Sequence, residues 1–121
     1  MPTVFILDDD VNLLVALELL LSRNAYKVYT FSNSADLMLA LGQLIPDIIL
    51  LDILLAETKT GEVVCQELKQ QYNYPNKIYL FSATHIPEHE LLKSGADGFM
   101  DKPFEIEDLL NMLNKSLFKQ P

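Results

Sequence analysis

The sequence predicts an α/β fold with a parallel sheet, built as one domain over residues 1–121. Two observations carry this prediction. Short apolar runs alternate five times with longer segments whose apolar residues recur at helical spacing. No linker or low-complexity segment interrupts the series. Such alternation favours a parallel sheet whose strands are joined by right-handed helical crossovers.

The first expected strand comprises residues 3–7 and stops at Asp8. Asp10 follows as a candidate N-cap, and the helix that it opens carries one apolar stripe and closes at residues 22–24. A second strand is expected over residues 26–31, where aromatic and β-branched residues are concentrated. The apolar stripe of the first expected helix consists of Leu13, Leu14, Leu17, Leu20 and Leu21.

A second helix is expected after residues 32–34, which offer N-caps, and Gly42 marks its end. The third strand, residues 48–52, is apolar until its last residue, Asp52. Apolar side chains on both faces of a strand indicate that helices cover both sides of the sheet. A loop over residues 54–60 follows. The apolar positions of the second helix are Leu37, Met38, Leu41 and Leu44.

The third helix is expected over residues 61–71, and a fourth strand over residues 77–81 ends at Ser82. The inner face of this helix is expected to carry Val63, Val64 and Leu68.

A short fourth helix is expected to begin near Pro87 and to end at Gly95, because proline suits a first helical turn. The fifth strand comprises residues 98–100. Glu105 and Glu107 favour the start of a last helix. Its apolar positions are Leu109, Leu110, Leu113 and Leu117.

The composition excludes several classes of function. Half of the residues are hydrophobic and 21% are charged, which is typical of a globular protein. The formal charge of −8 argues against nucleic-acid binding through this chain, because phosphate contacts need clustered Lys and Arg. The single Cys65 is expected to be buried and inert. The sequence shows no signal-peptide pattern and no apolar stretch for membrane insertion, so we expect a cytoplasmic protein.

Polar residues of a particular kind follow four of the expected strands. Asp8 and Asp9 follow the first, Asp52 ends the third, Ser82 follows the fourth and Lys102 the fifth. In a flavodoxin-like, doubly wound sheet of strand order 2-1-3-4-5, the first and third strands are neighbours, and ligands bind beyond the carboxyl ends at this switch point. Two carboxylates 4 Å apart repel by roughly 4 kcal/mol at an effective dielectric of 20. A bound cation relieves this repulsion, and Mg²⁺ prefers such oxygen ligands.

The same residues suit phosphoryl chemistry. A carboxylate such as Asp52 can accept a phosphoryl group as an acyl phosphate. The Ser82 hydroxyl can donate a hydrogen bond to a phosphoryl oxygen, and the Lys102 ammonium can neutralise another. In phosphoryl transfer the protein mainly positions groups and stabilises charge.

Over essentially its whole length, the chain resembles the receiver domains of two-component response regulators. The resemblance rests on five segments that occur in order at strand-helix spacing. These are VFILDDD (4–10), PDIILLD (46–52), FSA (81–83), GADGF (95–99) and DKPF (101–104).

The resemblance implies a role for each matching residue. Asp52 corresponds to the phosphoacceptor, which receives its phosphoryl group from a sensor histidine kinase or a histidine phosphotransfer protein. Asp9 corresponds to the direct Mg²⁺ ligand, and Asp8 acts through a bound water. The backbone carbonyl of Leu54 completes the metal site.

Three further residues take roles from the same resemblance. Ser82 matches the hydroxyl that reports phosphorylation, and Lys102 matches the phosphate-binding lysine before a cis proline, Pro103. Phe99 stands at the switch position and is expected to rotate inward when Ser82 moves. The implied function is a Mg²⁺-dependent phosphoacceptor switch that alters affinity for a downstream protein target. The resemblance implies that the protein is not an enzyme and promotes only its own phosphorylation and dephosphorylation.

Two departures from the family pattern carry expectations of their own. Ala56 occupies the position of a family proline, and Gly61 falls one residue later than the family glycine. We expect a longer and looser loop, which affects contact with a kinase more than chemistry at Asp52. The segment 82–102 is short, which predicts a reduced fourth helix. The family commonly signals through this helix, the fifth strand and the last helix, so we expect an unusual output surface.

Other interpretations remain open or are disfavoured. The altered loop leaves open a receiver-like interaction module that does not switch. A phosphatase with an aspartyl-phosphate intermediate is disfavoured, because Leu54 stands where such enzymes carry a second aspartate. Residues 85–89 spell H-x-x-E-H, a pattern of certain zinc proteases, but Pro87 separates the histidines and the chain is short.

Two expectations concern lifetime and context. In the family, the side chains at Leu54 and Thr84 flank the path of an attacking water. Neither can orient that water, so a long-lived phosphoryl group is expected. Because only a short tail, residues 119–121, follows the last expected helix, the chain is either a stand-alone regulator or a piece of a larger protein.

Overall fold

The computed structural model describes residues 1–55, 57–83 and 87–118. Its five strands form one parallel sheet of order β2-β1-β3-β4-β5, which confirms the predicted strand order and flavodoxin-like fold class. The strands are β1 (Thr3–Leu7), β2 (Lys27–Phe31), β3 (Ile48–Asp52), β4 (Lys77–Ser82) and β5 (Gly98–Asp101).

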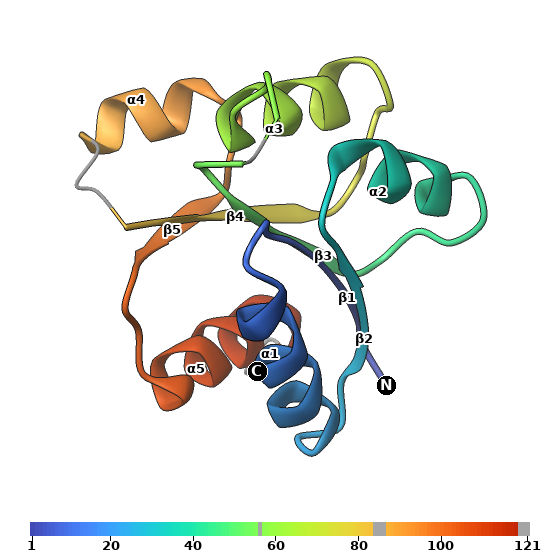
Figure 1. The fold of residues 1–121 in the computed structure, drawn as a ribbon, viewed down its shortest axis with the longest axis vertical. Helices are drawn as coiled ribbons and strands as arrows, with labels where there is room; N and C mark the ends of the chain where they lie inside the picture. Colours follow the sequence, from blue (N-terminus) through green and yellow to red (C-terminus); the bar gives the residue numbers. More distant parts are fainter. Residues whose placement is uncertain (56, 84–86, 119–121) are drawn as a thin grey trace.

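Five helices cover the two faces of the sheet (Figure 1). Helices α2, α3 and α4 lie above the sheet in this view, and α1 and α5 lie below it. Right-handed crossovers produce this three-layer arrangement in a parallel sheet. The helices are α1 (Val11–Ser22), α2 (Ser34–Leu41), α3 (Gly61–Gln70), α4 (Glu88–Lys93) and α5 (Ile106–Leu117).

The core is divided by the sheet into two apolar clusters, because successive residues of a strand point to opposite faces. Phe5, Ile49 and Leu80 pack beneath α2, α3 and α4. Val4 and Leu50 pack against α1 and α5 on the other face. Every residue of β3 is buried, as expected for a central strand covered on both sides.

Short polar residues cap three of the helices, and two of these caps agree with the predictions. The Asp10 carboxylate accepts from the Leu13 backbone N–H at 3.2 Å, which confirms the predicted cap of α1. Asn33 is the cap of α2 among the three candidates before it, and Thr60 caps α3. Each cap satisfies an N–H group that the first helical turn leaves free.

The helices also differ from the predictions in two places. Leu44 was expected on the second helix, but α2 ends at Leu41 and Leu44 lies beyond the turn at residues 42–43. Val63 was expected on the inner face of α3, but it is exposed, while Val64, Cys65 and Leu68 are buried. Three adjacent apolar residues, 63–65, allow two helical faces, and packing on the sheet selects the second and third.

The fourth helix is reduced, as predicted. Helix α4 has six residues, against eight to twelve in the other four helices of the described chain. Pro87 is its N-cap residue, and Gly95 follows its end with φ of +88°. Within the described residues, no helix is long and apolar enough to cross a membrane.

Candidate functional site

The carboxyl ends of the strands bring the predicted site residues to one edge of the sheet. Leu7 pairs with Leu51, so Asp8 and Asp52 leave neighbouring strands at the same level. On the other side of β3, Asp52 pairs with Phe81. The sequence places polar residues just there, and the parallel register makes them neighbours.

Three carboxylates form a cluster at this edge. Asp8, Asp9 and Asp52 each offer an oxygen, and these atoms all lie within 4.8 Å of one another. Asp8 is 1% exposed and Asp52 6% exposed, whereas Asp9 is exposed. Buried carboxylates this close repel strongly unless positive charge compensates them.

Lys102 supplies part of this compensation. Its Nζ donates to Asp8 Oδ2 at 2.6 Å and lies 3.3 Å from Asp52 Oδ1. The Asp10 backbone N–H donates to the second oxygen, Asp8 Oδ1, at 2.9 Å. Both oxygens of the Asp8 carboxylate therefore accept a hydrogen bond, one from the Lys102 ammonium and one from the backbone N–H of Asp10, the N-cap residue of α1.

The electrostatics of the cluster shift two pKa values upward. Burial raises the pKa of the Asp52 carboxyl, and the neighbouring charge of Asp8 raises it further against the opposing effect of Lys102. Burial by itself disfavours the charged Lys102, but its hydrogen bond to Asp8 and the nearby carboxylate charges outweigh this and raise the pKa of Lys102. Lys102 therefore stays an ammonium, whereas Asp52 holds its negative charge at a cost.

Ser82 and Lys102 are fixed relative to each other by the backbone. Ser82 ends β4 and is buried, and its carbonyl accepts the Lys102 backbone N–H at 2.7 Å. The peptide bond from Lys102 to Pro103 is cis, as the resemblance implied. No buried side-chain N or O of the described residues lacks a hydrogen-bond partner, Ser82 included.

The predicted switch residue lies apart from the carboxylates. Phe99 pairs with Leu80 in the sheet and is partly buried against the core cluster beneath α2, α3 and α4. This placement is compatible with an aromatic residue that changes rotamer, but its rotation stays a prediction.

The loop after Asp52 returns to the carboxyl end of β3 at Gly61. The Gly61 N–H donates to the Ile53 carbonyl at 2.9 Å. A Cβ at Gly61 would lie 2.2 Å from the Asp52 carbonyl oxygen, which leaves no room for any side chain. The sequence gives one signal of this need for glycine: Gly61 is the single glycine between Asp52 and the end of α3.

Several predictions concern residues for which the structure leaves the question untested. The Leu54 side chain is exposed, and the role of its carbonyl stays a prediction. Ala56, Thr84 and His85 lie outside the described residues, so the predictions that name them also stay predictions. His89, the second histidine of the H-x-x-E-H pattern, is exposed on α4.

The family model of the response regulator receiver domain matches residues 4–114 of this chain. The chain belongs to that family.

Solved structures of receiver domains share the fold at low sequence identity. A two-component response regulator of Clostridium difficile superposes with a TM-score of 0.89 at 20% identity, covering 98% of each chain. Chemotaxis protein CheY4 of Vibrio cholerae gives 0.88 at 24%, covering 97% of this chain and 99% of that one. The BeF3-activated receiver domain of Klebsiella pneumoniae RstA gives 0.86 at 21%, with coverage of 97% and 99%. Their similarity shows the fold.

Membership in this family classifies the protein as a receiver domain of two-component systems. Receiver domains are phosphoacceptor switches rather than enzymes of the ordinary kind, and a buried aspartate at the strand edge agrees with that class.

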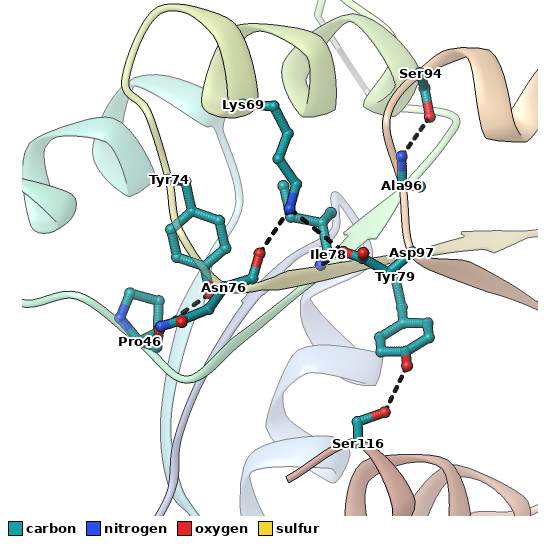
Figure 2. Close-up of polar contacts among 10 residues, drawn as sticks. All are labelled: Pro46, Lys69, Tyr74, Asn76, Ile78, Tyr79, Ser94, Ala96, Asp97 and Ser116. Atoms are coloured by element: carbon teal, nitrogen blue, oxygen red, sulfur yellow. Dashed lines mark hydrogen bonds and ion pairs between the residues drawn. The ribbon is translucent and has the colours of Figure 1, made fainter.

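The opposite edge of this receiver domain, at the amino ends of the strands, carries a hydrogen-bond network that sequence reasoning missed (Figure 2). The Tyr74 hydroxyl and the Asn76 amide both donate to the Pro46 carbonyl, at 3.0 and 2.9 Å. This carbonyl precedes β3, so both donors fix the start of the strand that ends at Asp52.

A lysine connects this network to β5. Lys69 Nζ donates to the Asn76 carbonyl at 2.7 Å and lies 3.4 Å from the Asp97 carboxylate, as Figure 2 shows. The same Asp97 oxygen accepts the Ile78 backbone N–H at 2.8 Å. The only signal in the sequence was Asp97 in the GADGF segment, since the other residues occur in ordinary turns and helix surfaces.

Proposed function

We propose that this receiver domain accepts a phosphoryl group on Asp52 in a Mg²⁺-dependent reaction and thereby changes its affinity for a partner protein. The observation that carries the proposal is the position of Asp52: its carboxylate is buried, lies 3.3 Å from the Lys102 ammonium, and has an oxygen within 4.8 Å of oxygens of two further carboxylates. The family of the chain supports the same function.

The chemistry proposed for Asp52 is nucleophilic. One oxygen of the ionised carboxylate forms the bond to phosphorus as the bond from phosphorus to the donor nitrogen breaks, leaving an acyl phosphate and a free donor imidazole. Lys102 lies 3.3 Å from the carboxylate and can neutralise a phosphoryl oxygen that arrives there. The Ser82 hydroxyl ends the neighbouring strand, where it can donate to another oxygen of the group.

The donor set fits a magnesium ion. Asp8, Asp9, Asp52 and Lys102 together leave a formal charge of −2, which a divalent cation balances. All the ligand atoms are oxygens, the kind that Mg²⁺ prefers. Asp8, Asp9, Asp52 and the Leu54 carbonyl would hold it. When bound, the ion supplies positive charge to the phosphoryl oxygens.

A sensor histidine kinase or a histidine phosphotransfer protein is the proposed donor, and helix α1 offers a surface for it. Val11, Val15 and Leu19 are exposed and recur every four residues, so they form one apolar stripe. The stripe starts three residues after Asp8 and extends away from the site. A donor that packs on this stripe has its reactive histidine close to the carboxylates. A cytoplasmic location is part of the proposal.

The test uses a small phosphodonor, such as a phosphoramidate, with Mg²⁺ and the whole chain. We expect incorporation of one phosphoryl group by the wild type and none by Asp52→Asn. Asp101→Asn is the matched control, because Asp101 is an exposed carboxylate at the same edge of the sheet. It should incorporate as much as the wild type. Equal incorporation by Asp52→Asn would refute the assignment, and incorporation without Mg²⁺ would refute the metal requirement.

A further inference from the structure

A groove runs between helices α2 and α3, on the face of the sheet away from α1 and α5 (Figure 1). It consists of two adjoining hollows of about 140 and 620 Å³ that share Met38 and Tyr72. We call it the α2–α3 groove and define it by Met38, Leu39, Ile45, Lys59, Glu67 and Tyr72.

The groove gathers exposed apolar side chains. Leu39 is 74% exposed, Ile45 53% and Tyr72 50%. Val63, which was expected to face the core, is exposed on α3 one turn before Glu67. Single exposed apolar residues are ordinary on protein surfaces, but a grouped set around a hollow marks a binding surface.

One end of the groove is polar and on balance acidic. The Lys59 ammonium donates to Glu67 at 2.9 Å, so these two charges offset each other. Glu57 accepts the backbone N–H of Ser34, a groove residue, at 3.4 Å and adds a negative charge beside the pair. A group that enters this end is favoured when it carries positive charge, and the chain's charge of −8 favours the same sign.

We propose that the α2–α3 groove binds an amphipathic helix of a partner protein, with apolar residues on one face and Lys or Arg at the end beside Glu57 and Glu67. Helix α2 has eight residues, or about 12 Å, so a partner helix meets it over about two turns. Two or three apolar anchors at spacing i, i+4 and i+7 fill such a length.

The groove is connected to the phosphoacceptor, and this part of the inference rests on the proposed function. The loop that leaves Asp52 supplies Glu57 and Lys59 to the groove before it returns at Gly61. Gly61 lies against the Asp52 carbonyl with no room for a Cβ. A change in the backbone at Asp52 therefore reaches the loop directly, and we expect a phosphoryl analogue to change the affinity of the groove for the helix.

The experiment titrates two designed helical peptides into the isotope-labelled whole chain and follows the backbone amides by NMR. Both peptides carry one leucine stripe, and the polar face is lysine in one and glutamate in the other. We expect the lysine peptide to shift amides of residues 34–45 and Tyr72 and to bind about tenfold more tightly than its glutamate counterpart. Leu39→Ser should weaken binding about tenfold. Leu92→Ser is the matched control, a leucine on α4 that is 52% exposed, and it should leave the peptide affinity unchanged.

Several results would overturn the proposal. Absence of binding, shifts confined to other faces, equal affinity for the two peptides, or insensitivity to Leu39→Ser would each refute the docking site. Self-association through α2 and α3 in the absence of peptide would assign the groove to a second copy instead.

Addition of beryllofluoride and Mg²⁺ separates the two hypotheses. Shifts around Asp52 together with altered peptide affinity support the connection, and shifts around Asp52 with unaltered affinity refute it. If beryllofluoride shifts nothing while the lysine peptide still binds the groove, the proposed function fails and the docking site stands.

Discussion

The polar groups at the two edges of the sheet are paired in opposite ways. At the amino edge, Tyr74 and Asn76 share one carbonyl acceptor, and Lys69 faces Asp97, so donors and acceptors match. At the carboxyl edge, three carboxylates lie close together, and among the described residues the Lys102 ammonium contacts two of them, Asp8 and Asp52. The polar groups of the amino edge find their partners within the chain, whereas the carboxyl edge retains excess negative charge.

This difference separates stability from function. A matched network holds strands in place, because a lost partner leaves a buried polar group unsatisfied. An unmatched cluster costs stability and creates affinity for a cation and a phosphoryl group. Removal of a carboxylate from the cluster is therefore expected to stabilise the fold, whereas removal of a hydrogen-bond donor at the amino edge is expected to destabilise it without affecting phosphorylation. The predictions below test this comparison in order of decreasing effect.

The largest effect is expected from Lys102→Met. Removal of the ammonium leaves Asp8 and Asp52 buried without the cation that contacts them, which costs about 3 kcal/mol of unfolding free energy. Loss of its charge should slow phosphorylation of Asp52 about 100-fold. Urea unfolding and phosphate incorporation measure the two effects. Lys77→Met, at an exposed lysine that begins β4, is the control and should change stability by less than about 0.5 kcal/mol. Equal losses in both variants would contradict this account.

Gly61→Ala comes next. The added Cβ would meet backbone atoms, the Asp52 carbonyl oxygen at 2.2 Å and its carbon at 2.8 Å, which cannot rotate away. We expect a loss of about 3 kcal/mol and impaired phosphorylation. In Gly42→Ala the nearest atom is the Leu39 carbonyl oxygen at 3.3 Å, and φ is −68°. That variant should change stability by about 1 kcal/mol or less. Thermal unfolding decides, and a stable Gly61→Ala protein would show that the loop can move aside.

A smaller effect is expected at the amino edge. Tyr74→Phe removes a buried hydroxyl that donates to the Pro46 carbonyl and should cost about 1 kcal/mol of unfolding free energy. Phosphorylation should be unchanged, because the hydroxyl lies at the far end of β3. Tyr72→Phe is the control, since Tyr72 is half exposed. A drop in phosphate incorporation by the folded Tyr74→Phe variant would contradict the claim that the amino edge contributes to stability and not to phosphorylation.

The smallest effect concerns Asp52 itself. Burial raises the pKa of its carboxyl above the ordinary 3.8, so the folded chain binds this proton more tightly than the unfolded chain. The resulting stability is present below pH 3.8 and is lost as pH rises through the raised pKa. At neutral pH, without Mg²⁺, Asp52→Asn should therefore unfold at higher urea concentration than the wild type. A lower midpoint for Asp52→Asn at pH 7 would contradict the assigned electrostatics.

The carboxyl edge could be predicted from the sequence because its residues directly follow the strands. Once the parallel order is known, Asp8, Asp52 and Lys102 must lie at one edge of the sheet. The cap at Asp10 was equally local, since it depends on residues three positions apart.

The rest depends on contacts between distant segments, which a pattern of residue types does not encode. The amino-edge network joins Pro46 to Tyr74 and Lys69 to Asp97, pairs separated by 28 positions each. The outward position of Val63 follows from how α3 rotates on the sheet. The steric role of Gly61 follows from the close approach of its backbone to the Asp52 carbonyl. In the sequence, Gly61 is visible only as a glycine that falls one residue later than the family position.

Asp10 connects the carboxylate cluster to the helix that carries the exposed apolar stripe, α1. Its N–H holds Asp8, and its carboxylate caps the helix whose outer face carries the apolar stripe of Val11, Val15 and Leu19. Thermodynamic coupling between two ligands is reciprocal, so a donor that shifts the start of α1 must change Mg²⁺ affinity by the same factor by which Mg²⁺ changes donor affinity. The concentration of the ion would then also set how tightly each donor binds.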